Sequence, residues 1–100
     1  MNKIINGKRY DTKTATLKGK FSCGSKSSFH YWEENLYQKK TGEWFLYGVG
    51  SALSKYSDCS DGRSWGIEKI MPYTEDEAKE WAEKYMLADK YEELFGKVEE

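Results

Sequence analysis

Long apolar runs are absent from this 100-residue sequence. No stretch approaches the roughly 18 consecutive apolar residues that a membrane-spanning helix needs. Residues 1–7 (MNKIING) also lack the apolar stretch of a secretory signal peptide. We therefore expect a cytoplasmic protein that makes no contact with a membrane.

Catalytic motifs are absent as well. The sequence holds one histidine, His30, and two cysteines, Cys23 and Cys59. It contains no nucleophile elbow, zinc-protease motif, P-loop or dinucleotide-binding fingerprint, and a chain this short has little room for a two-lobed substrate cleft. We therefore expect no enzyme activity, with a cysteine nucleophile paired with His30 as a minor alternative.

Neither sign of charge dominates, and the formal net charge is −1. Residues 1–40 carry nine Lys or Arg against three Asp or Glu, whereas residues 41–100 carry seven against fourteen. This division argues against imitation of a nucleic-acid backbone by acidity along the whole chain, and against nucleic-acid binding by uniform basicity.

Aromatic residues are plentiful, at 16% of the chain, and charged residues make up a further 33%. This aromatic content is far above that of a disordered segment. We therefore expect residues 1–100 to fold as a single domain whose core is built largely from rings.

Turn signals and apolar patterns divide the chain into short elements. The Asn-Gly pair at residues 6–7 predicts a hairpin within residues 2–10. The other expected elements are a helical turn at 12–17, polar loops at 22–28 and 57–64, and strands at 29–40, 43–49 and 65–71. Glycines 48 and 50 are expected to break the second of these strands, and Pro72 to end the third.

The C-terminal part predicts helices. Residues 74–77 (TEDE) form a capping box, in which Thr74 and Glu77 each accept a hydrogen bond from the other's backbone. A single apolar stripe follows, made of Ala78, Trp81, Ala82, Tyr85 and Met86. We expect a helix over 75–87 and a short one over 89–95. The predicted fold class is α+β: an antiparallel sheet of four or five strands, covered on one face by the longer helix.

Two polar loops contain the ligands of a zinc site. Cys23 and His30 flank the first loop, and Cys59 lies between Asp58 and Asp61 in the second. Zinc binds thiolate, imidazole and carboxylate, and a metal would link loops that a small core orders poorly. We predict a structural zinc held by Cys23, His30, Cys59 and Asp58 or Asp61, although the spacing matches no standard finger. Two free thiols and a disulfide between the cysteines are the alternatives.

Each charged part of the chain suggests a partner. Lysines alternate with aromatic residues in residues 3–32, as in platforms for single-stranded nucleic acid, but a solvated lysine face over an aromatic core is the simpler interpretation. Off the apolar stripe of the predicted helix lie Glu75, Glu80 and Glu83, which suit a basic protein partner.

Several segments resemble one family of proteins. These are residues 5–12 (INGKRYDT), 36–48 (LYQKKTGEWFLYG), 54–56 (SKY), 77–84 (EAKEWAEK) and 91–96 (YEELFG). They are similar to a family of small proteins from phages, prophages and other mobile elements of Gram-positive bacteria. The family does not regularly carry cysteines in the two loops, so the predicted zinc site rests on this chain's own residues.

The resemblance implies a phage protein that evades host defence, and proteins of this origin include anti-CRISPR inhibitors. We therefore expect a nuclease inhibitor that acts by protein–protein interaction in the host cytoplasm. Its partner would be a type II CRISPR-associated nuclease, blocked at a surface needed for nucleic-acid loading. The expected anchors are Trp44 and Tyr47, on opposite faces of their strand, one of which should prove to be core. The alternative is a small nucleic-acid-binding or regulatory protein that uses the basic N-terminal half.

Overall fold

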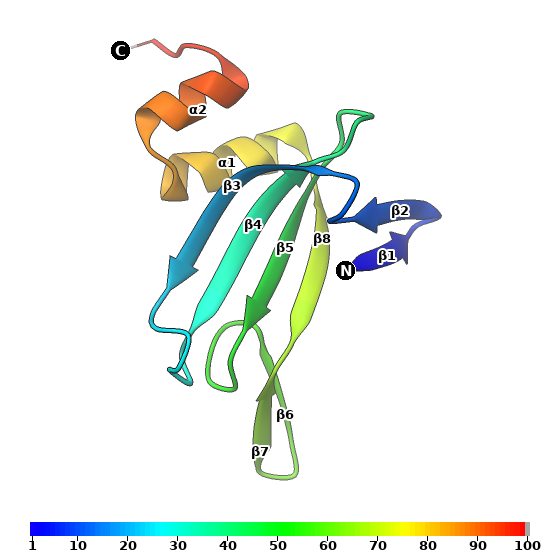
Figure 1. Cartoon of the computed structure of the whole chain (residues 1–100), viewed down its shortest axis with the longest axis vertical. Coiled ribbons are helices and arrows are strands. Elements are labelled where there is room, and N and C mark those ends of the chain that lie inside the picture. The colour runs from blue at the N-terminus through cyan, green and yellow to red at the C-terminus, as the bar shows by residue number, and fades with distance from the viewer. Residues whose placement is uncertain (100) are drawn as a thin grey trace.

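A computed structural model describes residues 1–99 of the chain. In this part of the chain, strands precede two C-terminal helices (Figure 1). The strands are β1 (Asn2–Ile5), β2 (Lys8–Asp11), β3 (Thr16–Cys23), β4 (Trp32–Gln38), β5 (Trp44–Gly50), β6 (Ser57–Ser60), β7 (Arg63–Gly66) and β8 (Glu68–Tyr73). The helices are α1 (Glu75–Tyr85) and α2 (Ala88–Phe95). None of the helices within residues 1–99 is long and apolar enough to cross a membrane.

The central element is a four-stranded antiparallel sheet of order β3-β4-β5-β8. Two small hairpins, β1-β2 and β6-β7, stand outside it. The predicted α+β class and the antiparallel sheet under a C-terminal helix are therefore confirmed. Since side chains alternate along a strand, residues 32, 34, 36 and 38 of β4 share one face with 44, 46, 48 and 50 of β5.

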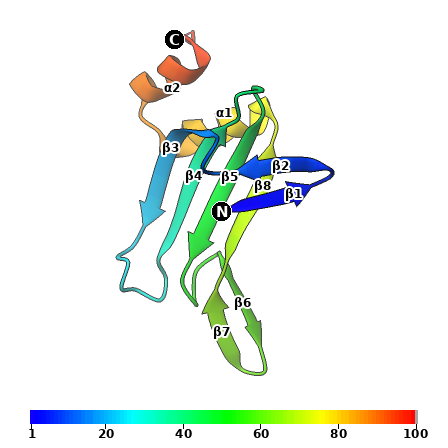
Figure 2. The ribbon, with the colours of Figure 1, turned by 45° about the vertical axis from the view of Figure 1, so that its right-hand side comes forward.

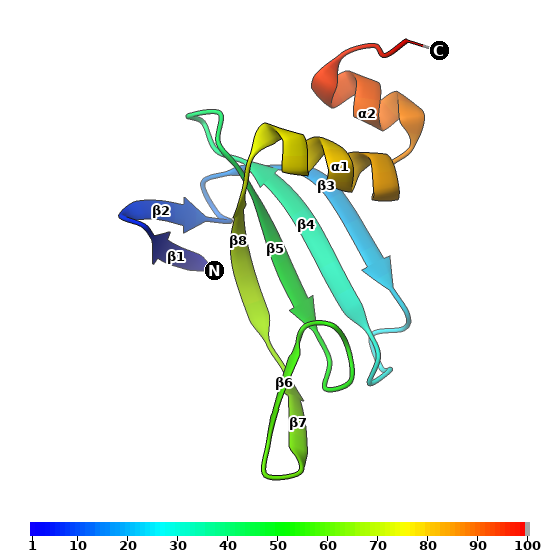
Figure 3. The ribbon, with the colours of Figure 1, turned by 180° about the vertical axis from the view of Figure 1, so that it is seen from behind.

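Helix α1 lies across that face of the sheet (Figure 3). Its capping box is present, with the Glu77 amide donating to Thr74 Oγ1 at 3.1 Å and the Thr74 amide to Glu77 Oε1 at 2.9 Å. The predicted apolar stripe packs on the sheet in a cluster of Leu36, Trp44, Leu46, Ala78 and Trp81. Burial of these rings and aliphatic chains is the main force that holds α1 in place.

The β1-β2 hairpin covers the upper part of the opposite face (Figure 2). Its turn has positive φ at both Asn6 and Gly7, as the Asn-Gly pair predicts. Tyr10 of β2 meets the Phe45 ring edge-on, with centroids 5.6 Å apart, and both are buried beside Ile70. The sheet therefore has a small core on each side.

Three sequence-based expectations for the strands are wrong. The segment expected to form a helical turn leads into β3, where a bulge between Leu17 and Gly19 hides the alternation. The expected loop at 57–64 is the β6-β7 hairpin, which turns at Asp61 and Gly62 with positive φ at both. The expected break at Gly48 and Gly50 is absent, and β5 continues to Gly50. The glycine at position 48 makes room for the Tyr56 ring, which occupies the place of a side chain there.

Strand boundaries also differ. Strand β4 begins at Trp32 rather than at residue 29. Pro72 lies inside β8 instead of ending it. This strand is at the edge of the sheet, where a missing backbone N–H leaves no partner unpaired.

Candidate functional site

The predicted zinc ligands lie at the end of the sheet away from the helices. Cys23 is the last residue of β3, and Cys59 lies in β6; both are exposed free thiols. The His30 ring donates through Nδ1 to the Leu53 carbonyl oxygen, 3.2 Å away. Asp58 accepts a hydrogen bond from the backbone amide of Cys59 at 2.8 Å.

Within residues 1–99, no three His, Cys, Asp or Glu side chains come together as a metal site would require. Asp61 forms the tip of the β6-β7 hairpin. A zinc ion held by these residues would need the two loops to approach each other. The zinc site stays a prediction that metal analysis can test.

The two predicted anchors do lie on opposite faces of β5. Trp44 is 6% exposed and packs in the core against Phe95, with ring centroids 5.1 Å apart. It is therefore the core member of the pair and is not available to a partner. Tyr47 faces away from α1, is half-buried, and donates from its hydroxyl to Glu68 Oε2 at 2.5 Å.

Tyr47 lies at the border between the covered and the open part of this face, because it packs against the Tyr10, Phe45 and Ile70 cluster under the β1-β2 hairpin. The β1-β2 hairpin lies over the upper part of this face, while the lower parts of β3, β4 and β5 have no element in front of them (Figure 2). The strand register places Ser22, Glu33, Val49 and Glu68 in one row across this open area; the row above it is Lys20, Asn35, Tyr47 and Ile70, in which Ile70 is buried with Tyr10 under the hairpin. We call these two rows the open face.

The open face is polar around its aromatic centre. Glu33 accepts a hydrogen bond from Tyr31 at 3.3 Å and pairs with Lys20 at 3.7 Å. Burial and the neighbouring Glu68 carboxylate raise the pKa of Tyr47, so its hydroxyl stays protonated and remains a donor. This combination of a ring, a fixed hydroxyl and flanking charges is typical of a protein-binding surface.

The three predicted helix glutamates, Glu75, Glu80 and Glu83, are all exposed on α1. Glu80 also lines a hollow of about 250 Å³ between α1 and the sheet. The other residues of this hollow are Glu34, Lys55, Tyr73, Glu77, Trp81, Lys84 and Tyr85. Its lining therefore combines three carboxylates, two ammonium groups and three aromatic rings.

Glu34 is the buried charge at the bottom of this hollow, with 3% of its surface exposed. One carboxylate oxygen accepts from the Trp81 indole Nε1 at 2.9 Å. The other accepts from the Tyr56 hydroxyl and from the Lys55 ammonium, the latter at 2.9 Å. A buried carboxylate needs such donors, because leaving it unpaired would cost several kcal/mol, on the order of 3–5.

These contacts decide the protonation state of Glu34. Burial by itself would raise the pKa of this carboxyl, but the hydrogen bonds from Tyr56, Lys55 and Trp81 outweigh it and hold the pKa below its ordinary value. The negative charge of Glu34 also affects Tyr73, which lines the same hollow. Burial and the Glu34 and Glu77 carboxylates raise the pKa of Tyr73. Glu34 is therefore ionised at neutral pH, and the three carboxylates of the hollow outnumber its two ammonium groups by one.

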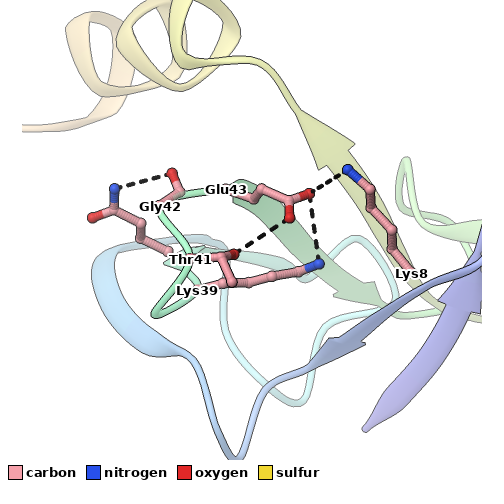
Figure 4. Close-up of polar contacts among 6 residues, drawn as sticks. Lys8, Lys39, Thr41, Gly42 and Glu43 are labelled. Carbon is pink, nitrogen blue, oxygen red and sulfur yellow. Dashed lines mark hydrogen bonds and ion pairs between the residues drawn. The ribbon is translucent and has the colours of Figure 1, made fainter.

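A group of basic residues lies around the β4-β5 turn, near the start of α1 (Figure 3). In the β4-β5 turn, the Glu43 carboxylate lies 3.4 Å from Lys8 Nζ and 3.7 Å from Lys39 Nζ, and accepts from Thr41 at 3.3 Å (Figure 4). Lys39 also sits over the Tyr10 ring, 3.6 Å from its centroid. A hollow of about 200 Å³ next to this turn is lined by Arg9, Asp11, Thr14, Lys39, Lys40 and Thr41. Arg9, Lys39 and Lys40 thus form one local basic patch, whose Lys39 is paired with Glu43.

Sequence reasoning missed Glu34 and Lys55 altogether. A glutamate inside an alternating strand predicts an exposed side chain, and nothing in the sequence near position 55 indicates a role. The available signal was Trp81, whose place on a buried stripe requires an acceptor for its indole N–H.

Comparisons with protein-family models, with curated proteins and with solved structures find no match to this chain.

Proposed function

We propose that this protein is a non-catalytic inhibitor that binds another protein through the open face, with Tyr47 as its anchor. The observation that carries this proposal is the half-buried Tyr47 at the border of the hairpin's cover, with its hydroxyl held by Glu68 beside the open part of the sheet. A tyrosine held in place by a fixed hydrogen bond loses little conformational entropy on binding, which makes it an effective anchor at an interface.

The partner we propose is a type II CRISPR-associated nuclease of the bacterial host. The resemblance of residues 36–48 and 77–84 to phage and prophage proteins supports this choice. A net charge of −1 does not support imitation of DNA. We propose instead that the inhibitor occupies a protein surface that the nuclease needs for guide or target loading.

Direct binding to the purified nuclease tests the anchor. Tyr47→Ala should weaken the affinity at least about 30-fold, which corresponds to about 2 kcal/mol of binding free energy. Trp65→Ala is the control, because Trp65 is an aromatic residue, 44% accessible, on the separate β6-β7 hairpin. It should leave the affinity within about twofold. Equal losses for both variants, or an unchanged affinity for Tyr47→Ala, would contradict the proposal.

The same assay assigns a role to the helix glutamates. Reversing Glu75 and Glu83 to lysine should mainly slow association and change its dependence on salt, because exposed charges steer encounter more than they hold a complex together. If that double variant loses all affinity and Tyr47→Ala loses none, the interface is electrostatic and lies on α1.

A second candidate function is binding of nucleic acid at the basic patch. The specific observation in its favour is the hollow that brings Arg9, Lys39 and Lys40 together. Phosphate binding there would release counterions, so retention on immobilised DNA should fall steeply with salt. Arg9→Ala combined with Lys40→Ala should abolish that retention while leaving binding to the nuclease unchanged.

A further inference from the structure

Aromatic rings and a carboxylate lie around the Lys55 ammonium group. Its Nζ lies 4.1 Å from the centroid of the Trp32 ring, 5.6 Å from that of Tyr56 and 6.0 Å from that of Tyr85. The same nitrogen lies 2.9 Å from Glu34 Oε2. Three aromatic rings and one carboxylate therefore surround a single cation. We call this arrangement the ammonium cage.

The ammonium cage does not depend on Lys55 for its shape. The Trp32 and Tyr85 rings are 6.0 Å apart, and both contact Phe21, at 5.6 Å and 4.5 Å. Tyr56 packs on Gly48, where a Cβ atom would lie only 2.1 Å from its ring. Each wall is thus fixed by packing on the sheet or on α1.

The carboxylate is likewise fixed without Lys55. The Trp81 indole and the Tyr56 hydroxyl both donate to Glu34, and both are neutral donors from buried residues. If Lys55 moved away, the carboxylate would stay in the same place with a vacant acceptor site and a full negative charge. Such a site attracts a replacement cation.

Lys55 itself is in a position to leave. Its side chain is 45% exposed, whereas that of Glu34 is 4% exposed. It belongs to the segment between β5 and β6, not to the sheet. The hollow of about 250 Å³ beside it, which Glu77 and Glu80 also line, opens a route to the same carboxylate.

We propose that the ammonium cage is a binding site for a primary ammonium group of another molecule, and that Lys55 is the internal cation which this ligand displaces. Rings and a carboxylate are the groups that bind alkylammonium ions. The group that makes the 2.9 Å contact with Glu34 is itself a primary ammonium, and the contact requires an N–H donor, which a quaternary ion lacks. The ligand is a lysine side chain of a protein or a small free amine.

The test uses the intact protein and its own reporters. The Trp81 indole N–H and the Trp32 indole signal are followed by NMR while methylammonium, tetramethylammonium or a blocked lysine is added at constant ionic strength. Lys55→Ala empties the cage, and Lys90→Ala is the matched control, since it removes the same charge from an exposed site on α2.

Lys55→Ala should bind the blocked lysine with a Kd of about 1–10 mM, as expected for one ammonium in a partly desolvated cage. Wild type and Lys90→Ala should bind at least about tenfold more weakly, because the internal lysine must first be displaced. Adding Glu34→Gln to Lys55→Ala should remove the binding, with far-UV circular dichroism confirming that the double variant is folded.

Several results would overturn the proposal. One is that Lys55→Ala binds blocked lysine no more tightly than wild type does. Another is that sodium chloride causes the same shifts of the indole signals. The third is that tetramethylammonium binds as tightly as methylammonium. If Lys55→Ala does not fold, the wild-type Lys55 ammonium resonance is followed instead, and blocked lysine should shift it while the Lys90 signal stays constant. Tighter binding of blocked lysine than of methylammonium assigns the site to a protein side chain, and equal binding assigns it to a free amine.

Discussion

Replacing Trp81 with phenylalanine removes the indole N–H that donates to Glu34 and leaves an aromatic ring in the core. Trp81 is 5% exposed, and its Nε1 lies 2.9 Å from the carboxylate. The variant therefore separates the hydrogen bond from most of the packing. Trp81→Ala removes both.

The expected magnitudes differ for the two variants. A hydrogen bond to a charged group contributes about 1.5–3 kcal/mol, so Trp81→Phe should lower the free energy of unfolding by about 2 kcal/mol. For a domain of this size, that loss lowers Tm by about 8–16 °C. Trp81→Ala also leaves a cavity under α1, and truncation of a core tryptophan alone costs about 3–5 kcal/mol.

At acid pH, the free energies of unfolding of Trp81→Phe and wild type should differ less than at neutral pH. The pKa of Glu34 is lowered in the folded state, so its contribution to stability is complete above the unfolded pKa of about 4.3 and is lost as pH falls through the folded value. The indole donates to the ionised form. Removing it raises the folded pKa, so the difference is largest at neutral pH and shrinks below about pH 4.

Urea unfolding at pH 7 and at pH 3.5, followed by circular dichroism, measures these quantities. Trp65→Phe is the control, because that exposed ring donates to no buried group, and it should change stability by less than about 0.5 kcal/mol. A Trp81→Phe variant as stable as wild type at pH 7 would refute the role of the indole as a donor to a buried charge. A gap that stays constant with pH would show that the loss comes from packing alone.

Three further predictions concern other parts of the fold. Gly48→Ala should cost about 1–3 kcal/mol in urea unfolding, because the new Cβ would lie 2.1 Å from the Tyr56 ring; a neutral result would mean that Tyr56 can move freely. Thr74→Ala should cost about 1 kcal/mol through loss of the capping box, and Thr74→Ser should restore most of it. If zinc is bound, metal analysis should find about one ion per chain, and Cys59→Ser should lower both the metal content and Tm. No metal, together with two titratable thiols in the native protein, would end the zinc prediction.

The sequence predicts best where one local pattern decides the outcome. The capping box at Thr74 places the start of α1 correctly because both of its hydrogen bonds are made within four residues. The Asn6-Gly7 turn is equally local. The Asp61-Gly62 pair carries the same signal for β6-β7, but the polar composition around it favoured a loop.

The candidate site depends on contacts that no local pattern contains. Glu34 meets Tyr56 across 22 positions of sequence and Trp81 across 47. Each residue alone has an ordinary interpretation as an exposed glutamate, a loop tyrosine or a core tryptophan. The register of β4 with β5, the packing of the segment after β5 over Gly48, and the position of α1 together bring the three to one place.

The order in which a ribosome makes this chain has a consequence for how it folds. All four strands of the central sheet are complete before the first residue of α1 is made, whereas the β1-β2 hairpin that covers the other face comes first. Leu36, Leu46 and Glu34 therefore have no cover from α1 during most of synthesis, and the carboxylate still lacks its indole donor. A nascent chain stalled at residue 73 should be readily cleaved by protease, and release of α1 should confer resistance in a single late step. The last quarter of the chain thus decides when the whole domain folds.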